Sequence, residues 1–144
     1  MQKLIVTSTS FVEGGQIPIQ NSCQDGNLSP QLKWVGAPKE TQYFAIKVDD
    51  PDAPRGVWVH WILINVPATK TELAEGETAG KEVTNDFGYR QYGGPCPPEG
   101  THRYFYKVFA LKEKLEVASK ENFDDIMKEK AIAFGQLMGL YTRK

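Results

Sequence analysis

The most apolar stretch of the chain is VWVHWILINV, at residues 57–66. Apolar side chains occupy both sides of an extended chain here, a pattern typical of a central strand covered on both faces. Strict alternation of side chains would place His60 on the same face as Trp58, Ile62 and Ile64. The stretch therefore predicts a sheet with packed layers on both sides, and a histidine inside it.

Two more strong strands are predicted, over residues 43–50 and 102–111. In the first, Asp50 falls on the apolar face at the strand end, and Pro51 then ends the strand. A carboxylate on a core face is costly unless it is paired or hydrogen-bonded, so Asp50 either caps the turn or lines a pocket. In the second strand, His102 and Tyr104 share one face with the following alternate residues.

The ends of the chain complete the expected fold. Short strands are predicted within residues 4–11 and at 32–34, and the apolar spacing over residues 123–138 fits helix with a break near Lys130. A last short strand is expected at 140–142. Strands first and helices last indicate a mainly β protein with an antiparallel core and a few peripheral helices near the C-terminus.

Composition limits the classes of function. The chain has 144 residues, with 17 basic and 18 acidic side chains and a formal net charge of -1, so one domain over residues 1–144 is expected. A near-zero charge disfavours nucleic acid as a partner. No apolar run is long enough for a transmembrane helix, no signal-peptide core follows Met1, and no basic amphipathic helix indicates stable membrane anchoring. A cytoplasmic location is expected.

The two cysteines, Cys23 and Cys96, lie in loop-like segments. They do not make a disulfide framework, and neither has a partner at zinc-site spacing. We expect two unpaired thiols in a reducing cytoplasm, with a single bridge as the alternative.

Chemistry-bearing residues gather near the predicted strand ends. Asp50, His60, His102 and Tyr104 supply an acid, two imidazoles and a phenol, and residues 92–100 form a loop rich in glycine and proline. If the strands are neighbours, these groups and the loop amides would form a small pocket for an anion. The same acid and histidines are also a set that a divalent metal or acid/base catalysis would use. No nucleophile accompanies them, which favours binding over catalysis and predicts no catalytic residue, metal or cofactor.

The order and spacing of several short motifs resemble the phosphatidylethanolamine-binding protein family, which includes Raf kinase inhibitor protein, and in particular its short prokaryotic branch. The resemblance runs from about residue 3 to the C-terminus. The motifs are Asp50-Pro51-Asp52-Ala53-Pro54, Val59-His60-Trp61, Tyr92-Gly93-Gly94-Pro95-Cys96-Pro97-Pro98 and His102-Arg103-Tyr104.

The resemblance implies a β-sandwich-like core of two antiparallel sheets and a small pocket for phosphate-like anions. Asp52 would support the rim of that pocket, and Trp58 would pack beside it. The pocket walls implied by the motifs are Asp50, His60, Gly94, Pro95, His102 and Tyr104.

For function, the resemblance implies non-enzymatic binding of a small phosphate or phosphate-ester headgroup. The alternative is a regulator that inhibits a kinase or a protease through the loops around the pocket. An acid/base enzyme using Asp50 and a histidine is the third reading, and a homodimer is compatible with all three.

Overall fold

The apolar stretch forms β5 (Trp58–Pro67), an interior strand of a six-stranded sheet in the computed structural model, which describes residues 1–144. The strand order of this sheet is β1-β9-β8-β4-β5-β7, and a smaller sheet has the order β2-β3-β6. All pairings are antiparallel except that of β1 with β9. The remaining strands are β1 (Gln2–Lys3), β2 (Ile5–Thr7), β3 (Leu32–Val35), β4 (Tyr43–Asp50), β6 (Glu72–Leu73), β7 (Lys81–Val83), β8 (Thr101–Leu111) and β9 (Ala131–Thr142).

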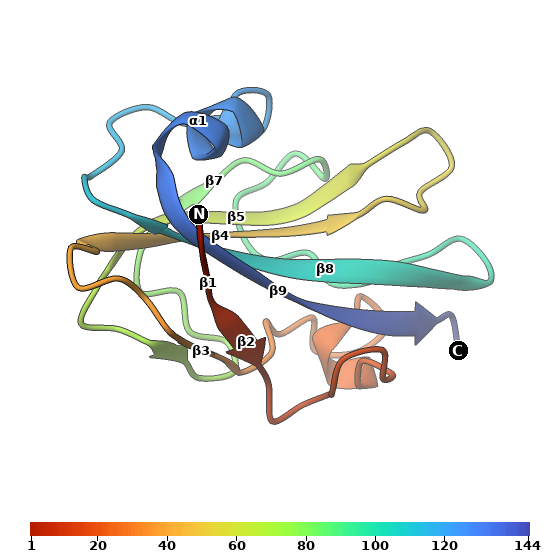
Figure 1. Cartoon of the computed structure of the whole chain (residues 1–144). Helices are drawn as coiled ribbons and strands as arrows, with labels where there is room; N and C mark the ends of the chain where they lie inside the picture. The colour runs from red at the N-terminus through yellow and green to blue at the C-terminus, as the bar shows by residue number, and fades with distance from the viewer.

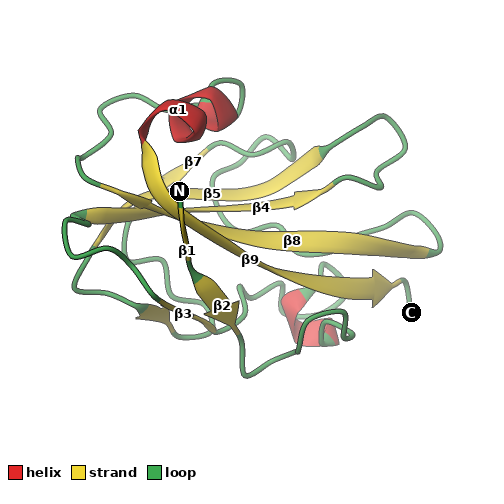
Figure 2. Ribbon diagram, in the orientation of Figure 1, coloured by secondary structure: helices red, strands yellow, loops and turns green.

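The elements stack in three layers, with the six-stranded sheet in the middle (Figure 1). Helix α1 (Phe123–Lys130) covers one face, and the smaller sheet and a short 3-10 helix (Ile19–Asn21) lie on the opposite side (Figure 2). The larger apolar core, of 21 buried residues, fills the space between the sheets, and a second core of nine lies beneath α1. Burial on both faces explains why β5 is apolar on both sides.

The predicted fold class is confirmed: the protein is mainly β, with two sheets and one helix near its C-terminus. Strands predicted at 43–50 and 102–111 appear as β4 and β8, and the one predicted at 32–34 appears as β3. Neither helical segment has the length and apolar character needed to span a bilayer.

The helical pattern predicted beyond Lys130 is wrong, because residues 131–142 form one long strand, β9. Its core-facing positions include Gly135 and Gly139, which carry no side chain and so hide the alternation from the sequence. Both are needed for close packing. A Cβ on Gly135 would lie 2.2 Å from the Leu4 carbonyl oxygen, and one on Gly139 would lie 2.6 Å from the Ile17 side chain.

Helix α1 is attached to the middle sheet by apolar packing and by buried charge. Phe123 and Met127 point into the smaller core. Lys47 of β4 is buried and forms ion pairs with Asp124 of the helix at 2.9 Å and with Asp49 at 3.6 Å. Buried charges need such partners, since an unpaired one would cost several kcal/mol.

A β-bulge interrupts the pairing of β4 with β5. Val48 pairs with Trp61, whereas the next residue, Asp49, pairs with Val59, so His60 is the extra residue on β5. His60 therefore lies on the inter-sheet side, as Trp61 does, while Ile62 lies in the core beneath α1. The prediction that His60 shares a face with Ile62 and Ile64 is wrong for this reason.

Replacement of Gly135 by alanine tests the close crossing of the N-terminal segment over β9. The new methyl group would collide with the backbone of Leu4, which cannot rotate away as a side chain can. We expect Gly135→Ala to lower the free energy of unfolding by about 2 kcal/mol, as overpacking does elsewhere. Urea denaturation measures the change. Gln136→Ala, at the exposed neighbouring position, is the matched control, and equal stabilities of the two variants would contradict the packing described.

Candidate functional site

The ends of three adjacent strands place the predicted site residues together. Asp50 ends β4, His60 is the bulged residue near the start of β5, and His102 and Tyr104 lie near the start of β8. Antiparallel pairing brings the end of β4 against the start of both neighbours, since Asp50 pairs with Trp58 and Asp49 with Phe105. Four side chains distant in sequence therefore meet at one edge of the inter-sheet core.

These side chains line a cavity of about 200 Å³. The polar groups in its wall are Asp50, His60, His102 and Tyr104. The rest of the wall is apolar or contains sulfur, and consists of Ala53, Pro54, Trp58, Phe87, Cys96, Pro97 and Pro98. A small cavity with a few convergent polar groups and apolar walls is the usual form of a small-ligand site.

Asp50 and His102 form a buried pair. The His102 Nδ1–H donates to Asp50 Oδ2 at 2.7 Å, and Asp50 Oδ1 accepts the backbone N–H of Asp52 at 2.7 Å. Asp50 thus both caps its turn and lines the cavity, the two roles that the sequence left open. Because Nδ1 is engaged, Nε2 is the nitrogen that His102 has available for a ligand.

His60 is held from behind by backbone carbonyls. Its Nδ1 contacts the carbonyl oxygens of Gly93 at 2.7 Å and Gly94 at 3.1 Å, and since carbonyls only accept, Nδ1 carries the proton. Burial lowers the pKa of His60, and the opposing effects of the Gly93 carbonyl and the Asp50 carboxylate do not cancel that of burial. The ring is therefore neutral at pH 7, and its Nε2 offers a lone pair.

The Tyr104 hydroxyl is buried and makes no hydrogen bond of good geometry to another protein group, although the Asp50 carboxylate and the Cys96 backbone N–H lie near it. Its ring packs edge-on to His60, with 5.2 Å between ring centroids. Burial and the neighbouring Asp50 carboxylate raise the pKa of the hydroxyl far above its ordinary value, so it stays protonated and able to donate. An unpartnered buried polar group is unusual, and in a cavity wall it indicates a site for a ligand.

Asp52 supports the site from outside the cavity wall. Its carboxylate accepts from the backbone N–H of Arg103 at 2.9 Å and from the guanidinium at 2.9 and 2.8 Å, which lowers the pKa of Asp52 to about 2. The interaction ties the turn after β4 to the start of β8 and so fixes His102 opposite Asp50. A supporting role of Asp52 at the rim of a ligand site stays a prediction.

The sequence suggested that the glycine loop offers its backbone amides to a ligand, but in the structure the amides of Gly93 and Gly94 already have partners within the protein. The Gly94 N–H donates to Asn27 Oδ1 at 2.7 Å, and the Gly93 N–H donates to the His60 carbonyl at 3.1 Å. Gly94 and Pro95 lie behind the cavity wall, where Gly94 orients His60 and the Pro95 carbonyl accepts from the backbone of Cys23. A Cβ on Gly94 would lie 2.2 Å from the Asn21 carbonyl oxygen, so packing requires the glycine.

The cysteines differ from expectation. Cys23 and Cys96 form a disulfide, with 5.4 Å between their Cα atoms, so the prediction of two unpaired thiols is wrong. Cys96 itself lines the cavity. Sequence reasoning also missed Phe87, whose ring contacts His60 at 5.1 Å and Trp58 at 5.6 Å between centroids. The signal available in the sequence was the position of Phe87 shortly before the glycine- and proline-rich loop of residues 92–100.

A larger groove of about 620 Å³ lies on the helix-covered side of the sheet, but its cations already have partners. Lys47 and Lys107 pair with Asp49, and Lys120 pairs with Asp86. No group of three or more histidine, cysteine or acidic side chains in the chain is arranged to hold a metal ion. The cavity at the strand ends is therefore the better candidate site.

Comparison with known proteins gives one consistent result. The family model described as phosphatidylethanolamine-binding protein matches residues 7–142. A UPF0098 protein of Methanothermobacter thermautotrophicus is 40% identical over 144 aligned residues, which cover 93% of this chain and 95% of the relative. The UPF0098 protein YbcL of Escherichia coli is 42% identical over 135 residues, covering 81% of this chain and 74% of the relative.

Solved structures agree with the sequence relatives. A Chlamydia trachomatis protein, described as a putative phosphatidylethanolamine-binding protein homolog, superposes with a TM-score of 0.92 at 33% identity, covering 100% of both chains. The crystal structure of E. coli YbcL, described as a new member of the mammalian family, gives a TM-score of 0.90 at 36% identity, covering 98% of this chain and 99% of the other.

Removal of the Tyr104 hydroxyl tests whether this group is left unpaired for a ligand. An unsatisfied buried hydroxyl costs free energy, so we expect Tyr104→Phe to raise the free energy of unfolding by about 1 kcal/mol. The matched control is Tyr106→Phe, which removes a 2.8 Å hydrogen bond to the Tyr92 hydroxyl and is expected to lower stability by about 1 kcal/mol. Urea denaturation without ligand distinguishes them, and a loss of stability in Tyr104→Phe would show that its hydroxyl has a structural partner.

Proposed function

Because this chain belongs to the phosphatidylethanolamine-binding protein family, a family of ligand- or protein-binding proteins, we propose that its cavity binds the phosphoryl group of a small phosphate ester. The observation that carries the proposal is the convergence of His60, His102 and the unpartnered Tyr104 hydroxyl on one cavity. Each of these groups can make a hydrogen bond to a phosphoryl oxygen or its proton.

The donors and acceptors in the cavity suit an anion that also carries a proton. Tyr104 donates its hydroxyl hydrogen, and neutral His60 accepts at Nε2 from a P–OH group or an ammonium. His102 donates from Nε2 when protonated, and its Nδ1–H then forms a charge-assisted bond to Asp50. A hydrogen phosphate monoester offers both the acceptors and the donor that this arrangement requires.

Size restricts the ligand further. Pockets for drug-sized molecules enclose roughly 300–1,000 Å³. The cavity here encloses about 200 Å³, so it accommodates a headgroup rather than a whole nucleotide. The exposed ring of Trp58 forms part of its wall, where it can contact the organic part of an ester. A phosphomonoester with a short organic group, such as phosphorylethanolamine, fits these limits.

Asp50 imposes a proton requirement on binding. Its carboxylate is 3% exposed, and a phosphate dianion placed beside it would be repelled unless a positive charge develops nearby. Protonation of a histidine, or a proton carried by the phosphate, supplies that charge. We therefore treat binding as coupled to proton uptake rather than as attraction to a preformed positive pocket.

Other readings stay predictions. Inhibition of a kinase or a protease, an acid/base activity of Asp50 with a histidine, a homodimer and a cytoplasmic location each follow from the sequence or the family. The cavity directly supports a small ligand, and its binding is the property that we would measure first.

The pH dependence of phosphate binding tests the proposal. Burial lowers the pKa of His60, so this ring is neutral in the free protein at pH 7. In the proposed mode this neutral ring accepts from a P–OH group, so the bound ester must carry a proton and the affinity increases as the pH falls toward the second pKa of the phosphate, about 6. We expect phosphorylethanolamine to bind about tenfold more tightly at pH 5.5 than at pH 8. A tenfold change in affinity is what a pKa shift of one unit on binding would produce. Isothermal titration calorimetry measures both affinities.

Two variants and three ligands make that experiment specific. In His102→Asn, the side-chain amide can keep the bond to Asp50 but the Nε2 group is lost, so the affinity should fall at both pH values. Lys130→Ala removes an exposed ion pair with Glu113 and should bind normally. Inorganic phosphate, phosphorylethanolamine and short-chain phosphatidylethanolamine distinguish a free phosphate from a monoester and a lipid diester. A flat pH profile, or normal binding by His102→Asn, would exclude the proposed mode.

A further inference from the structure

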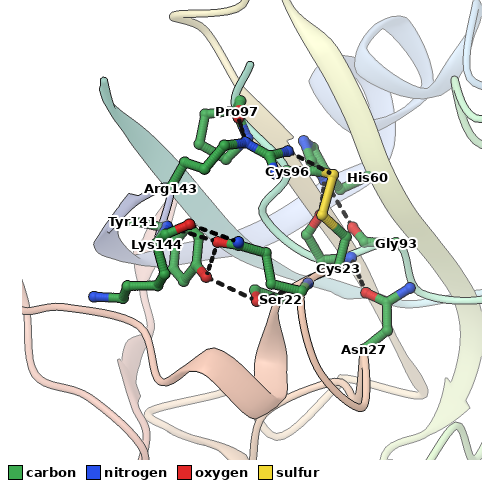
Figure 3. Close-up of a disulfide and its surroundings, with 12 residues drawn as sticks. Ser22, Cys23, Asn27, His60, Gly93, Cys96, Pro97, Tyr141, Arg143 and Lys144 are labelled. Carbon is green, nitrogen blue, oxygen red and sulfur yellow. Dashed lines mark hydrogen bonds between the residues drawn. A yellow bond between two sulfur atoms is a disulfide. The ribbon is translucent and has the colours of Figure 1, made fainter. Parts of the chain in front are cut away.

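The disulfide joins two loops that both support the cavity. Cys23 lies in the exposed loop after the 3-10 helix, and Cys96 lies in the cavity wall, 73 residues away in sequence (Figure 3). Two hydrogen bonds accompany the bridge, from the Cys23 N–H to the Pro95 carbonyl at 3.1 Å and from the Gly94 N–H to Asn27 Oδ1 at 2.7 Å. Residues 22–27 thus hold residues 93–96 in place.

The held segment fixes the site in two ways. The carbonyls of Gly93 and Gly94 orient His60, as Figure 3 shows for Gly93, and the following residues, Cys96 to Pro98, form one side of the cavity. The segment has no regular secondary structure, so no sheet ladder restrains it. A change in the covalent link would therefore alter both the position of His60 and the shape of the cavity.

The surroundings of the two sulfurs favour a thiol exchange in which Cys23 is attacked and Cys96 is the leaving group. Cys23 is exposed and accessible to an attacking thiolate, whereas Cys96 is half-buried. The Arg143 guanidinium lies beside the sulfur of Cys96, with Nη2 at 3.5 Å from Sγ and Nε donating to the Pro97 carbonyl at 2.6 Å (Figure 3). A neighbouring cation stabilises a thiolate, which makes Cys96 the better leaving group.

We propose that the Cys23–Cys96 disulfide is a redox latch that sets the affinity of the cavity for its ligand, with the oxidised form binding tightly and the reduced form weakly. The effect on affinity rests on the phosphate-binding function proposed above. The reductant is a dithiol. Its thiolate attacks Cys23 Sγ and the S–S bond breaks, so that Cys96 leaves as a thiolate beside Arg143. The second thiol of the reductant then displaces Cys23, and the products are two protein thiols and one oxidised dithiol.

Reduction acts on the site locally. Without the bridge, residues 93–96 keep the two hydrogen bonds between the loops and the bonds that Gly93 and Gly94 make with His60, but they lose their covalent link to residues 22–27. The carbonyl contacts to His60 then loosen, and the ring becomes more accessible to water. In a reducing compartment the disulfide would be reduced and the cavity would bind weakly, whereas in an oxidising compartment the disulfide would be intact and the cavity would bind tightly.

The test compares the oxidised protein, the protein treated with dithiothreitol, and the double variant Cys23→Ser/Cys96→Ser. NMR of the His60 ring protons across a pH series gives a readout that needs no ligand. We expect the His60 pKa to rise toward its ordinary value in the reduced protein and in the double variant, because burial is what lowers it. Calorimetry should show that the reduced protein and the double variant bind phosphorylethanolamine about tenfold more weakly than the oxidised protein. This is the change in affinity that a pKa shift of one unit would produce. Dithiothreitol added to the double variant is the control and should change neither quantity.

Arg143 supplies an independent measurement. Arg143→Gln removes the charge beside Cys96, so the rate of reduction by dithiothreitol, followed by thiol labelling and mass spectrometry, should fall several-fold. Amide hydrogen exchange checks that the effect is local: β4 should stay protected in the reduced protein, while the amides of Gly93 and Gly94, which donate to His60 and Asn27, lose protection.

The outcomes separate the two proposals. If reduction shifts the His60 pKa but neither form binds a phosphate compound, the ligand proposed above is wrong and the structural action of the latch stands. If the His60 pKa and the affinity are unchanged on reduction, the latch is excluded. Loss of protection throughout β4 and β8 would also exclude it, because the bridge would then stabilise the whole fold rather than the site.

Discussion

The arrangement of the site depends on the pairing of β4 with its two neighbours and on the single bulged residue in β5. Regular pairing of β4 with β8 carries Asp50 to the edge of the inter-sheet core. The bulge then turns His60 toward the same side, although the residues that follow it alternate in the opposite phase. Without that extra residue, His60 would face the helix layer, and the Asp50–His102 pair would have no second imidazole beside it. Bulges near active sites commonly re-aim one side chain in this way.

Most of the sheet could be predicted from the sequence, because its central strands have simple patterns. β5 is apolar on both faces, β4 carries Phe44, Ile46 and Val48 on one face, and β8 alternates along most of its length. β9 could not be predicted, since Gly135 and Gly139 occupy positions that face the core. The requirement for glycine is tertiary: Leu4 and Ile17 of the N-terminal segment approach too closely for any side chain. Alternation of apolar residues reveals a strand only where the inward positions carry side chains.

In the site too, the features set by the alternation of one strand could be predicted, whereas those set by contacts with distant segments could not. Alternation placed Asp50 on the apolar face of its strand and put His102 and Tyr104 together on one face of theirs, and the structure brings the three residues together. The orientation of His60 depends on register with another strand, which a single sequence does not contain. The loop glycines suggested exposed amides, but Asn27, 67 residues away, takes up the Gly94 N–H. The disulfide could not be predicted either, because it depends on the distance between two loops that are 73 residues apart in sequence.

The two hydrogen bonds to Asp50 have a consequence for which ions the cavity discriminates. One carboxylate oxygen is held by the Asp52 amide and the other by His102, so the negative charge cannot turn away from an entering ion. Sulfate, which carries no proton in neutral water, would meet that fixed charge and the lone pair of His60. A phosphomonoester, with a second pKa of about 6, arrives partly protonated and can donate to that lone pair. Under the proposed phosphate-binding function, this geometry would distinguish two tetrahedral anions of similar size by whether the ion brings its own proton.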